Sequence, residues 1–120
     1  FLMREIKFRA WNKYKALMIY DVDINSYGQV IKYDYGQYDG SYDYPVMQYT
    51  GLKDKNGLEI YEGDIVKCFR NEGFEFVTTR LGAHGIETQI GFYPFTEIDG
   101  HVEVIGNIYE NPELMDSADD

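Results

Sequence analysis

"VMQYTGLKDKNGLEIYEGDIVKCF", residues 46–69, is the stretch that decides the fold of this 120-residue chain. Two pieces rich in β-forming residues, 46–52 and 58–61, flank the dipeptide Asn56-Gly57. That dipeptide is typical of a hairpin turn, because both residue types adopt positive φ more readily than others. The sequence therefore predicts a β-hairpin here.

A second turn follows at Gly63 and Asp64. Glycine gives the backbone freedom to turn, and the Asp64 carboxylate can accept hydrogen bonds from backbone N–H groups. Residues 65–69 then predict the next strand. Because the residues that stand out in this stretch are those with special backbone demands, we interpret it as scaffold rather than as a binding site.

Downstream, the segments 74–80, 87–93 and 101–109 predict further strands, joined by "LGAHG" and "PFTEIDG". Short strands separated by tight turns are typical of a small closed or partly closed barrel, because closure removes exposed sheet edges. The last piece, "NPELMDSADD", predicts a short helical turn and a frayed acidic end.

Upstream, Ile6, Phe8 and Ala10 alternate with polar or amphipathic neighbours, which indicates a half-buried strand. "WNKYK" predicts a polar turn, and "ALMIYDVDI" a second strand that pairs with the first, with Phe8 and Ile19 among the buried residues. Residues 27–44 predict a long loop or an irregular hairpin. A flat hairpin has edges to protect, so we also expect a homo-oligomer.

The composition indicates one compact folded protein, with 44% hydrophobic and 17% aromatic residues. No apolar run approaches the roughly 20 residues that a transmembrane helix needs. The single cysteine, Cys68, cannot form an internal disulfide, and we expect a reducing cytoplasm. We read Phe1 and Leu2 as additions ahead of a natural start at Met3.

The net charge is −10, but positive residues gather at the start of the chain. This balance argues against a general nucleic-acid binder, since neutralising phosphates needs a concentrated basic surface. The alternative function, a nucleic-acid-binding module, would use the basic N-terminal hairpin, namely Arg4, Lys7, Arg9, Lys13 and Lys15.

Catalytic and metal sites are not indicated by the residue patterns. Cys68 with His84 or His101 as its base lacks a readable third, orienting group, and a buried free cysteine is the simpler interpretation. "DVDIN" resembles the opening of a calcium loop but lacks its glycine and its glutamate. We expect no enzyme activity, no cofactor and no metal.

Tyrosines are concentrated between residues 20 and 49, among glycine, serine and aspartate. This composition is typical of a binding loop, because tyrosine offers a large amphipathic contact area with few rotors to order. Cross-strand ring packing is the alternative, since the "YDY" spacing places both rings on one face of a strand. The candidate partner-binding residues are Tyr33, Tyr35, Tyr38, Tyr42 and Tyr44.

Three blocks, "MREIKFRAW", "VMQYTGLKDKNGLEIYEGDIVK" and "VEVIGNIYENPEL", together resemble the YopX family of phage and prophage proteins. The resemblance implies a mainly β protein whose larger part is an SH3-type barrel. It implies no activity and no site residues.

From these observations we expect a mainly β protein in which an N-terminal β-hairpin lobe packs on a small SH3-type β-barrel. The expected parts are the hairpin and tyrosine-rich segment at 3–45, the barrel at 46–112 and an acidic tail at 113–120. The expected function is that of a phage accessory protein that binds a host or phage protein without catalysis.

Overall fold

The structure, a computed structural model, describes residues 5–33, 36–37, 44–68, 74–80, 82–88, 91–95 and 102–118. It is mainly β with one short helix, which confirms the predicted fold class. The chain forms two compact units, residues 1–49 and residues 50–120. In the described part of the chain, every helix is too short or too polar to cross a membrane.

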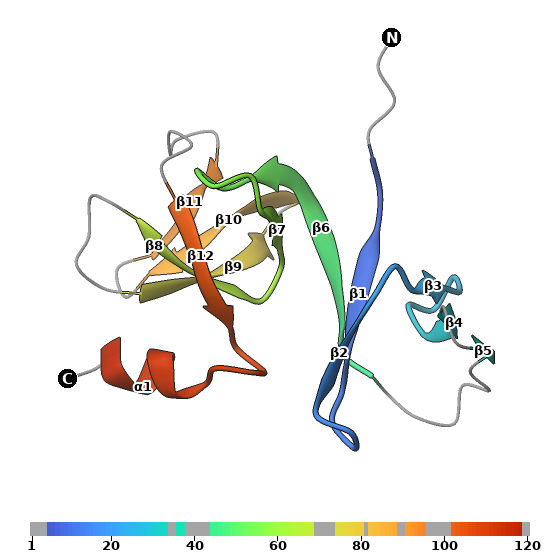
Figure 1. The fold of residues 1–120 in the computed structure, drawn as a ribbon. Helices are drawn as coiled ribbons and strands as arrows, with labels where there is room; N and C mark the ends of the chain where they lie inside the picture. Colours follow the sequence, from blue (N-terminus) through green and yellow to red (C-terminus); the bar gives the residue numbers. More distant parts are fainter. Residues whose placement is uncertain are drawn as a thin grey trace, which may run out of the picture. The chain divides into compact units, whose positions relative to one another are not determined.

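The first unit is built on the predicted N-terminal hairpin (Figure 1). Strand β1 (Phe8–Asn12) pairs antiparallel with β2 (Leu17–Tyr20), and Asn12 stands opposite Leu17 across the turn. Strand β6 (Val46–Lys53) pairs with β1 on the other side, with Gln48 opposite Phe8. The first unit therefore has the order β2-β1-β6, in which β2 is at the edge.

A second, smaller sheet of this unit has the order β3-β4-β5. Its strands are β3 (Asp23–Ile24), β4 (Val30–Tyr33) and β5 (Gly36–Gln37). Residues 27–44 thus contain an irregular hairpin, one of the two predicted outcomes. The core of the unit consists of buried Ala10, Val22 and Val30, on which other apolar side chains pack, namely Phe8, Ile19, Ile24, Tyr44 and Val46.

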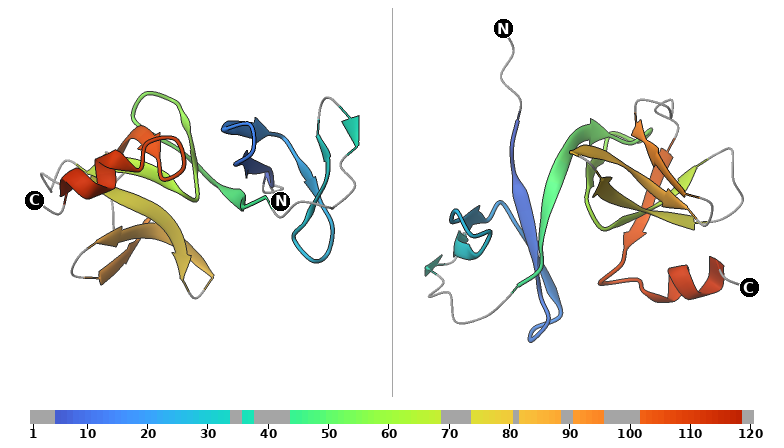
Figure 2. Two further views of the ribbon diagram at one scale, coloured as in Figure 1. Left: turned by 90° about the horizontal axis from the view of Figure 1, so that it is seen from below. Right: turned by 180° about the vertical axis from the view of Figure 1, so that it is seen from behind.

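The second unit is a curled sheet of order β11-β10-β9-β8-β12, drawn from two further sides in Figure 2. Its strands are β8 (Asp64–Cys68), β9 (Phe74–Arg80), β10 (Ala83–Thr88), β11 (Gly91–Pro94) and β12 (Val102–Asn107), accompanied by β7 (Glu59–Tyr61) and helix α1 (Glu113–Ala118). Its core is an apolar cluster of buried residues, namely Ile60, Val66, Val77, Ile86 and Val102.

The prediction of one strand at 87–93 is wrong. Residues 83–88 and 91–94 form two strands that pair with each other, with Thr88 opposite Gly91 and Gly85 opposite Pro94. The prediction of a loop at "LGAHG" is also wrong in its extent, because the register puts Ala83 opposite Arg80 and leaves only two residues between them. Because a hairpin connection can be this short, the next strand, β10, begins at Ala83, inside the segment predicted as a loop.

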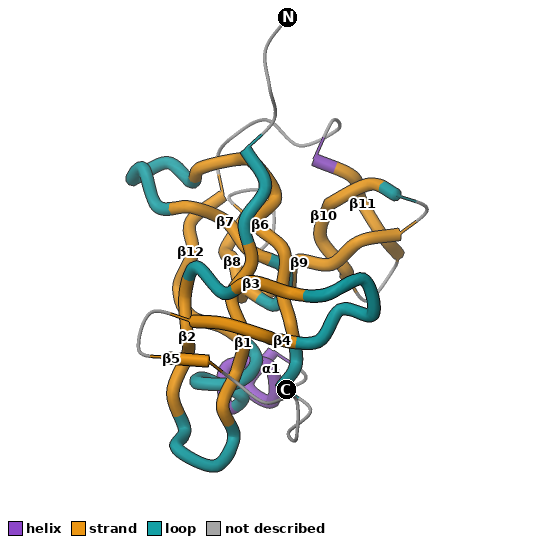
Figure 3. The backbone as a smooth tube through the Cα atoms, turned by 90° about the vertical axis from the view of Figure 1, so that its right-hand side faces the viewer, coloured by secondary structure: helices purple, strands orange, loops and turns teal. Residues whose placement is uncertain are grey.

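Asparagine and aspartate side chains close the short loops, which are teal in Figure 3. The Asn12 Oδ1 accepts hydrogen bonds from the N–H groups of Tyr14 (3.0 Å) and Lys15 (3.1 Å). In the predicted Gly63 turn, the Asp64 Oδ2 accepts the N–H of Tyr61 at 2.8 Å, as expected. Such bonds replace the sheet hydrogen bonds that a turn lacks.

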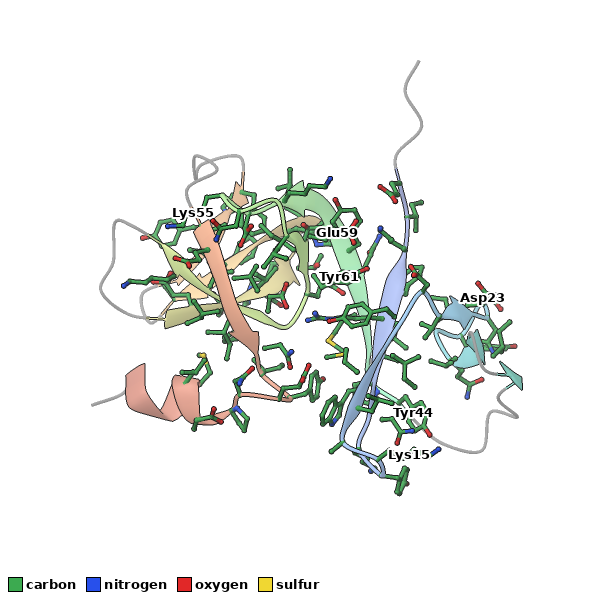
Figure 4. All side chains as sticks on the ribbon, viewed as in Figure 1. Lys15, Asp23, Tyr44, Lys55, Glu59 and Tyr61 are labelled. Carbon is green, nitrogen blue, oxygen red and sulfur yellow. The ribbon has the colours of Figure 1, made fainter. Side chains whose placement is uncertain are left out.

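The turn at residues 54–58 is the most heavily anchored. The Asp54 Oδ1 accepts the N–H groups of Asn56 (2.8 Å) and Leu58 (2.9 Å), and its Oδ2 accepts the N–H of Val104 (2.9 Å) on β12. Lys55, labelled in Figure 4, forms an ion pair with Glu103 of β12, in which the Lys55 Nζ lies 3.3 Å from the Glu103 Oε2. The turn is therefore fastened to a strand distant in sequence.

Positive φ occurs at Gly57 (85°) and Gly63 (86°), as predicted. Asn56 does not share it, so this connection is not the two-residue turn in which both central residues have positive φ. The turn is stabilised by the hydrogen bonds to the Asp54 side chain and not, as the sequence interpretation expects, by positive φ at Asn56.

Candidate binding surface

A hollow of about 570 Å³ opens on the first unit, between the start of β1 and the β3–β4 hairpin. It is lined by Ile6, Lys7, Phe8, Asp21, Val22, Asp23, Ile24 and Ile31. We call these residues the acidic–apolar hollow. Five of these eight residues are apolar, and the other three, Lys7, Asp21 and Asp23, are charged.

The hollow is positioned by the backbone between β2 and β3. The N–H of Val22 donates to the carbonyl of Phe8 at 3.2 Å, which holds this segment against β1. Asp21 has a φ of 54°, a left-handed conformation that aspartate tolerates better than most residues. This bend turns the chain from β2 into β3 at the edge of the hollow.

The charge that the hollow presents is negative. Asp21 and Asp23 are exposed, and no ion pair joins either carboxylate to another side chain that the structure describes. Lys7 has its own partners, because its Nζ lies 3.1 Å from Glu5 and 5.1 Å from the centre of the Tyr49 ring. The two aspartates therefore dominate the field at the margin.

Large exposed apolar side chains concentrate on the first unit. Within the described residues it carries six of the nine, namely Ile6, Tyr14, Leu17, Tyr20, Tyr27 and Ile31. Two of them belong to the hollow: Ile6 is 62% exposed and Ile31 is 43% exposed. Single exposed apolar residues are ordinary, whereas a group around a hollow marks a binding surface.

A second hollow of about 640 Å³ lies on the second unit, lined by Arg80, Ala83, Phe92 and Pro94. Among its described lining residues Arg80 is the charged one, and its Nε donates to the Glu87 Oε2 at 2.9 Å. The hydrogen bond and the charge of Glu87 raise the pKa of Arg80 above its ordinary value. This surface offers less polar recognition than the acidic–apolar hollow.

His84, Thr79 and Glu62 form a polar cluster at β9, β10 and the β7–β8 turn. The Thr79 hydroxyl lies 2.8 Å from the His84 Nδ1 and donates to the Glu62 carboxylate. In a nucleophile–base–acid relay the acid and the hydroxyl use opposite ring nitrogens, whereas here both lie at Nδ1. No cluster of three potential metal ligands occurs among the residues that the structure describes.

Of the other residues weighed for catalysis, Cys68 ends β8, but its side chain is outside the described part of the chain. His101 is outside it as well. His84 instead contacts Thr79, so the described geometry gives no support to the cysteine–histidine pair.

The predicted tyrosines are only partly visible. Tyr35, Tyr38 and Tyr42 lie outside the described residues, and Tyr33 is described as part of β4 without its side chain. Tyr44 is half-buried against the core of the first unit, and its ring centre lies 6.5 Å from that of Tyr14. At Tyr44, packing within the first unit therefore explains the presence of an aromatic side chain.

The basic residues of the N-terminal hairpin do not form one exposed surface. Arg9 is only 3% exposed, and Lys7 is engaged as described above. Lys13 and Lys15 are exposed at the β1–β2 turn, with the Lys13 Nζ 5.4 Å from the centre of the Tyr14 ring. Arg4 lies outside the described residues. The alternative of a nucleic-acid-binding module therefore stays a prediction, in which Lys13 and Lys15 are the hairpin residues that the structure describes as exposed.

Sequence reasoning missed the acidic–apolar hollow. The motif "DVDIN" overlaps the strand predicted at "ALMIYDVDI" and resembles a calcium loop, but the alternation of aspartate with Val22 and Ile24 was not used to predict a binding surface. That alternation could have indicated a strand with one apolar and one acidic face. Nothing in the sequence indicated that Ile6 and Ile31 would join it.

Comparison with known proteins identifies a family and finds similar solved structures. The family model described as YopX protein matches residues 7–116. The crystal structure of protein EF1440 from Enterococcus faecalis is 31% identical in sequence, with a TM-score of 0.69. The similarity covers 94% of this chain and 99% of that one. Among curated proteins there is no match.

Proposed function

This chain belongs to the YopX family, and on that premise we propose that it is a non-catalytic accessory protein of a phage or prophage that binds another protein in the bacterial cytoplasm. The observation that carries the proposal is the acidic–apolar hollow of the first unit, with exposed Ile6 and Ile31 around it. The second unit, whose curled sheet we assign to the SH3 type, serves as scaffold.

The chemistry of the hollow favours a protein segment as its occupant. Apolar side chains of a partner would bury Ile6 and Ile31, and this removal of apolar surface from water supplies the affinity. Lysine or arginine beside those apolar residues would meet Asp21 and Asp23, which adds selectivity and faster association. The expected partner motif is therefore aliphatic with a flanking cation.

The tyrosine-rich segment is the second element of the proposal. Tyr33 lies on β4 together with Ile31, and Tyr35, Tyr38 and Tyr42 follow closely in sequence. Tyrosines are typical hot-spot residues of protein interfaces. We propose that they extend the contact that begins at the hollow.

Affinity purification from host cells, with matched surface variants, tests this function. Ile31→Lys and Ile6→Lys place a charge in the hollow at positions that are already exposed, so the fold should be retained. Leu58→Lys, at a residue of the second unit that is 54% exposed, is the control. The wild type and Leu58→Lys should retain the same partner, and both hollow variants should lose it.

A variant in which Tyr35, Tyr38 and Tyr42 are replaced by serine tests the tyrosines separately. If it retains the partner while Ile31→Lys does not, the tyrosines leave the proposal and the hollow stays. Equal partner sets for the wild type and both hollow variants would refute binding at the hollow.

A further inference from the structure

The edge strand β2 lacks the features that usually protect a sheet edge. Its four residues, Leu17, Met18, Ile19 and Tyr20, are all apolar or aromatic, and the strand contains no proline and no charge. Among the strands that the structure describes, β2 has one neighbour, β1, and stands at the end of the sheet order. A strand of this kind offers backbone N–H and C=O groups to another strand.

Apolar surface lies along the same edge. Leu17 is 54% exposed and Tyr20 is 48% exposed, at the two ends of the strand, whereas Met18 is buried. A strand added beside β2 would therefore cover apolar side chains as well as pair backbone groups. Both contributions favour association of the edge over exposure to water.

The charges that flank β2 identify the strand that fits there. Exposed Lys13 and Lys15 lie before the strand, and exposed Asp21 and Asp23 lie after it. Figure 4 shows Lys15 at the β1–β2 turn and Asp23 on β3, beyond the other end of β2. The edge thus has a positive end and a negative end.

We propose that two copies of this chain associate through antiparallel pairing of their β2 strands. In that arrangement the lysine end of each copy meets the aspartate end of the other, and both ends of the pair are complementary. Parallel pairing would place like charges together at both ends, which is unfavourable. The edge is therefore complementary to itself in one orientation only.

The overall charge of the first unit permits this contact. Residues 1–49 contain six basic and six acidic side chains, whereas residues 50–120 contain five basic and fifteen acidic ones. Two copies can thus meet at the first unit without net repulsion, although the whole chain carries −10. A contact between two copies of the second unit would be less favourable, because both carry an excess of negative charge.

The paired segment is short. Ala16 and Asp21 both have positive φ (51° and 54°), so the extended backbone ends on each side of β2. Pairing over four residues predicts a weak, concentration-dependent dimer. The edge shares Asp21 and Asp23 with the acidic–apolar hollow but does not include Ile6 or Ile31, so that Ile31→Lys distinguishes self-association from the function proposed above.

Charge reversal with mixing tests the proposal. The mass of the full chain is measured by sedimentation from about 10 μM to about 1 mM, a range that spans weak association. Lys15→Asp and Asp21→Lys should each weaken dimerisation about tenfold or more, because each creates two like-charge contacts per dimer. An equimolar mixture of the two variants should dimerise again. The aspartate introduced in one variant then meets the lysine introduced in the other, and the native Lys15 and Asp21 that remain also meet.

Lys53→Asp, a charge reversal on the second unit, should leave dimerisation unchanged, as should Ile31→Lys in the hollow. If Asp21→Lys does not fold, Asp23→Lys takes its place, because it lies on β3 without the left-handed backbone. A wild-type mass of 14.0 kDa at every concentration would overturn the proposal. Failure of the mixture to dimerise, with both variants folded, would overturn it equally.

Discussion

Asp54 is a residue whose replacement should destabilise the fold, because it anchors a turn to a distant strand. Its buried carboxylate accepts three backbone N–H groups, from Asn56, Leu58 and Val104. Replacement by asparagine leaves one acceptor oxygen and turns an amide N–H₂ towards a backbone donor. We expect the free energy of unfolding to fall by about 1 to 3 kcal/mol, the usual cost of an unsatisfied buried donor.

The contribution of Asp54 to stability should also depend on pH. Burial by itself raises the pKa of Asp54, but the hydrogen bonds from Val104, Leu58 and Asn56 and the charge of Lys55 outweigh it and hold the pKa below its usual 3.8. A depressed pKa in the folded state means that the carboxylate stabilises the fold fully above its unfolded pKa and progressively less as the pH falls through the folded value.

Urea unfolding of the wild type and Asp54→Asn at pH 7 and at about pH 3 checks this. The difference in unfolding free energy should be largest at pH 7 and shrink on acidification. The control is Asp23→Asn, an exposed carboxylate whose loss should cost less than about 0.5 kcal/mol. An Asp54→Asn difference that grows towards acid would contradict the direction of the pKa shift.

Gly57 and Gly63 pose a second residue-scale test of the scaffold interpretation. Valine at either position should cost roughly 1 to 3 kcal/mol through backbone strain alone, because φ is positive at both. At Gly57 no atom lies within 4 Å of an added Cβ, so Gly57→Asn, which tolerates this conformation, should cost clearly less than Gly57→Val.

Thermal unfolding of these variants is compared with that of Lys53→Ala and Lys55→Ala. Both lysines are exposed, and the ion pair of Lys55 is a surface pair, so each change should cost less than about 0.5 kcal/mol. Loss of partner binding at the lysines without loss of stability would make the stretch a binding site after all.

At the element scale, β10 and β11 pair only because residue 85 is glycine. A Cβ at Gly85 would meet the carbonyl oxygen of Tyr93 and lie 2.7 Å from the Cα of Pro94. Both are backbone atoms of the neighbouring strand and cannot rotate away. We expect Gly85→Ala to cost about 2 kcal/mol or more and to loosen β11 first.

Hydrogen exchange of the β11 amides, measured beside chemical unfolding, would show that local loss of protection. Gly82→Ala is the matched control, since its Cβ meets nothing within 4 Å and only the positive φ of 79° opposes it. Equal effects of the two alanines would mean that close strand approach is unimportant at residue 85.

At the scale of the whole molecule, charge should make salt act in two opposite directions. The net charge of −10 resides in the second unit, where like charges repel in the folded state. Raising the salt concentration from about 20 mM to about 200 mM should therefore raise the melting temperature of the dilute chain, because the Debye length shortens.

The same salt should weaken the dimer proposed above, because its charged ends attract each other. Melting curves at low protein concentration and sedimentation at high concentration separate the two effects. A dimer that tightens with salt would indicate an apolar contact without the charge complementarity of the β2 edge.

The sequence by itself determined the turns and strands of residues 46–69, the N-terminal hairpin and the short C-terminal helix. These depend on local chemistry: glycines that must adopt positive φ, such as Gly57 and Gly63, and side chains such as Asp64 that bond to backbone groups within three residues. Interactions this close in sequence form wherever the chain goes. The order of the turns along the chain was therefore predictable.

Only the tertiary structure decided which distant groups meet. Asp54 also binds the N–H of Val104, 50 positions further along, Arg9 is buried on β1, and Ile6 joins Ile31 around the hollow. Each depends on how strands return past one another, because burial and long-range hydrogen bonds are properties of the neighbours and not of the residue type. The turns and strands could therefore be predicted from local sequence patterns. The binding surface could not, because it depends on tertiary packing.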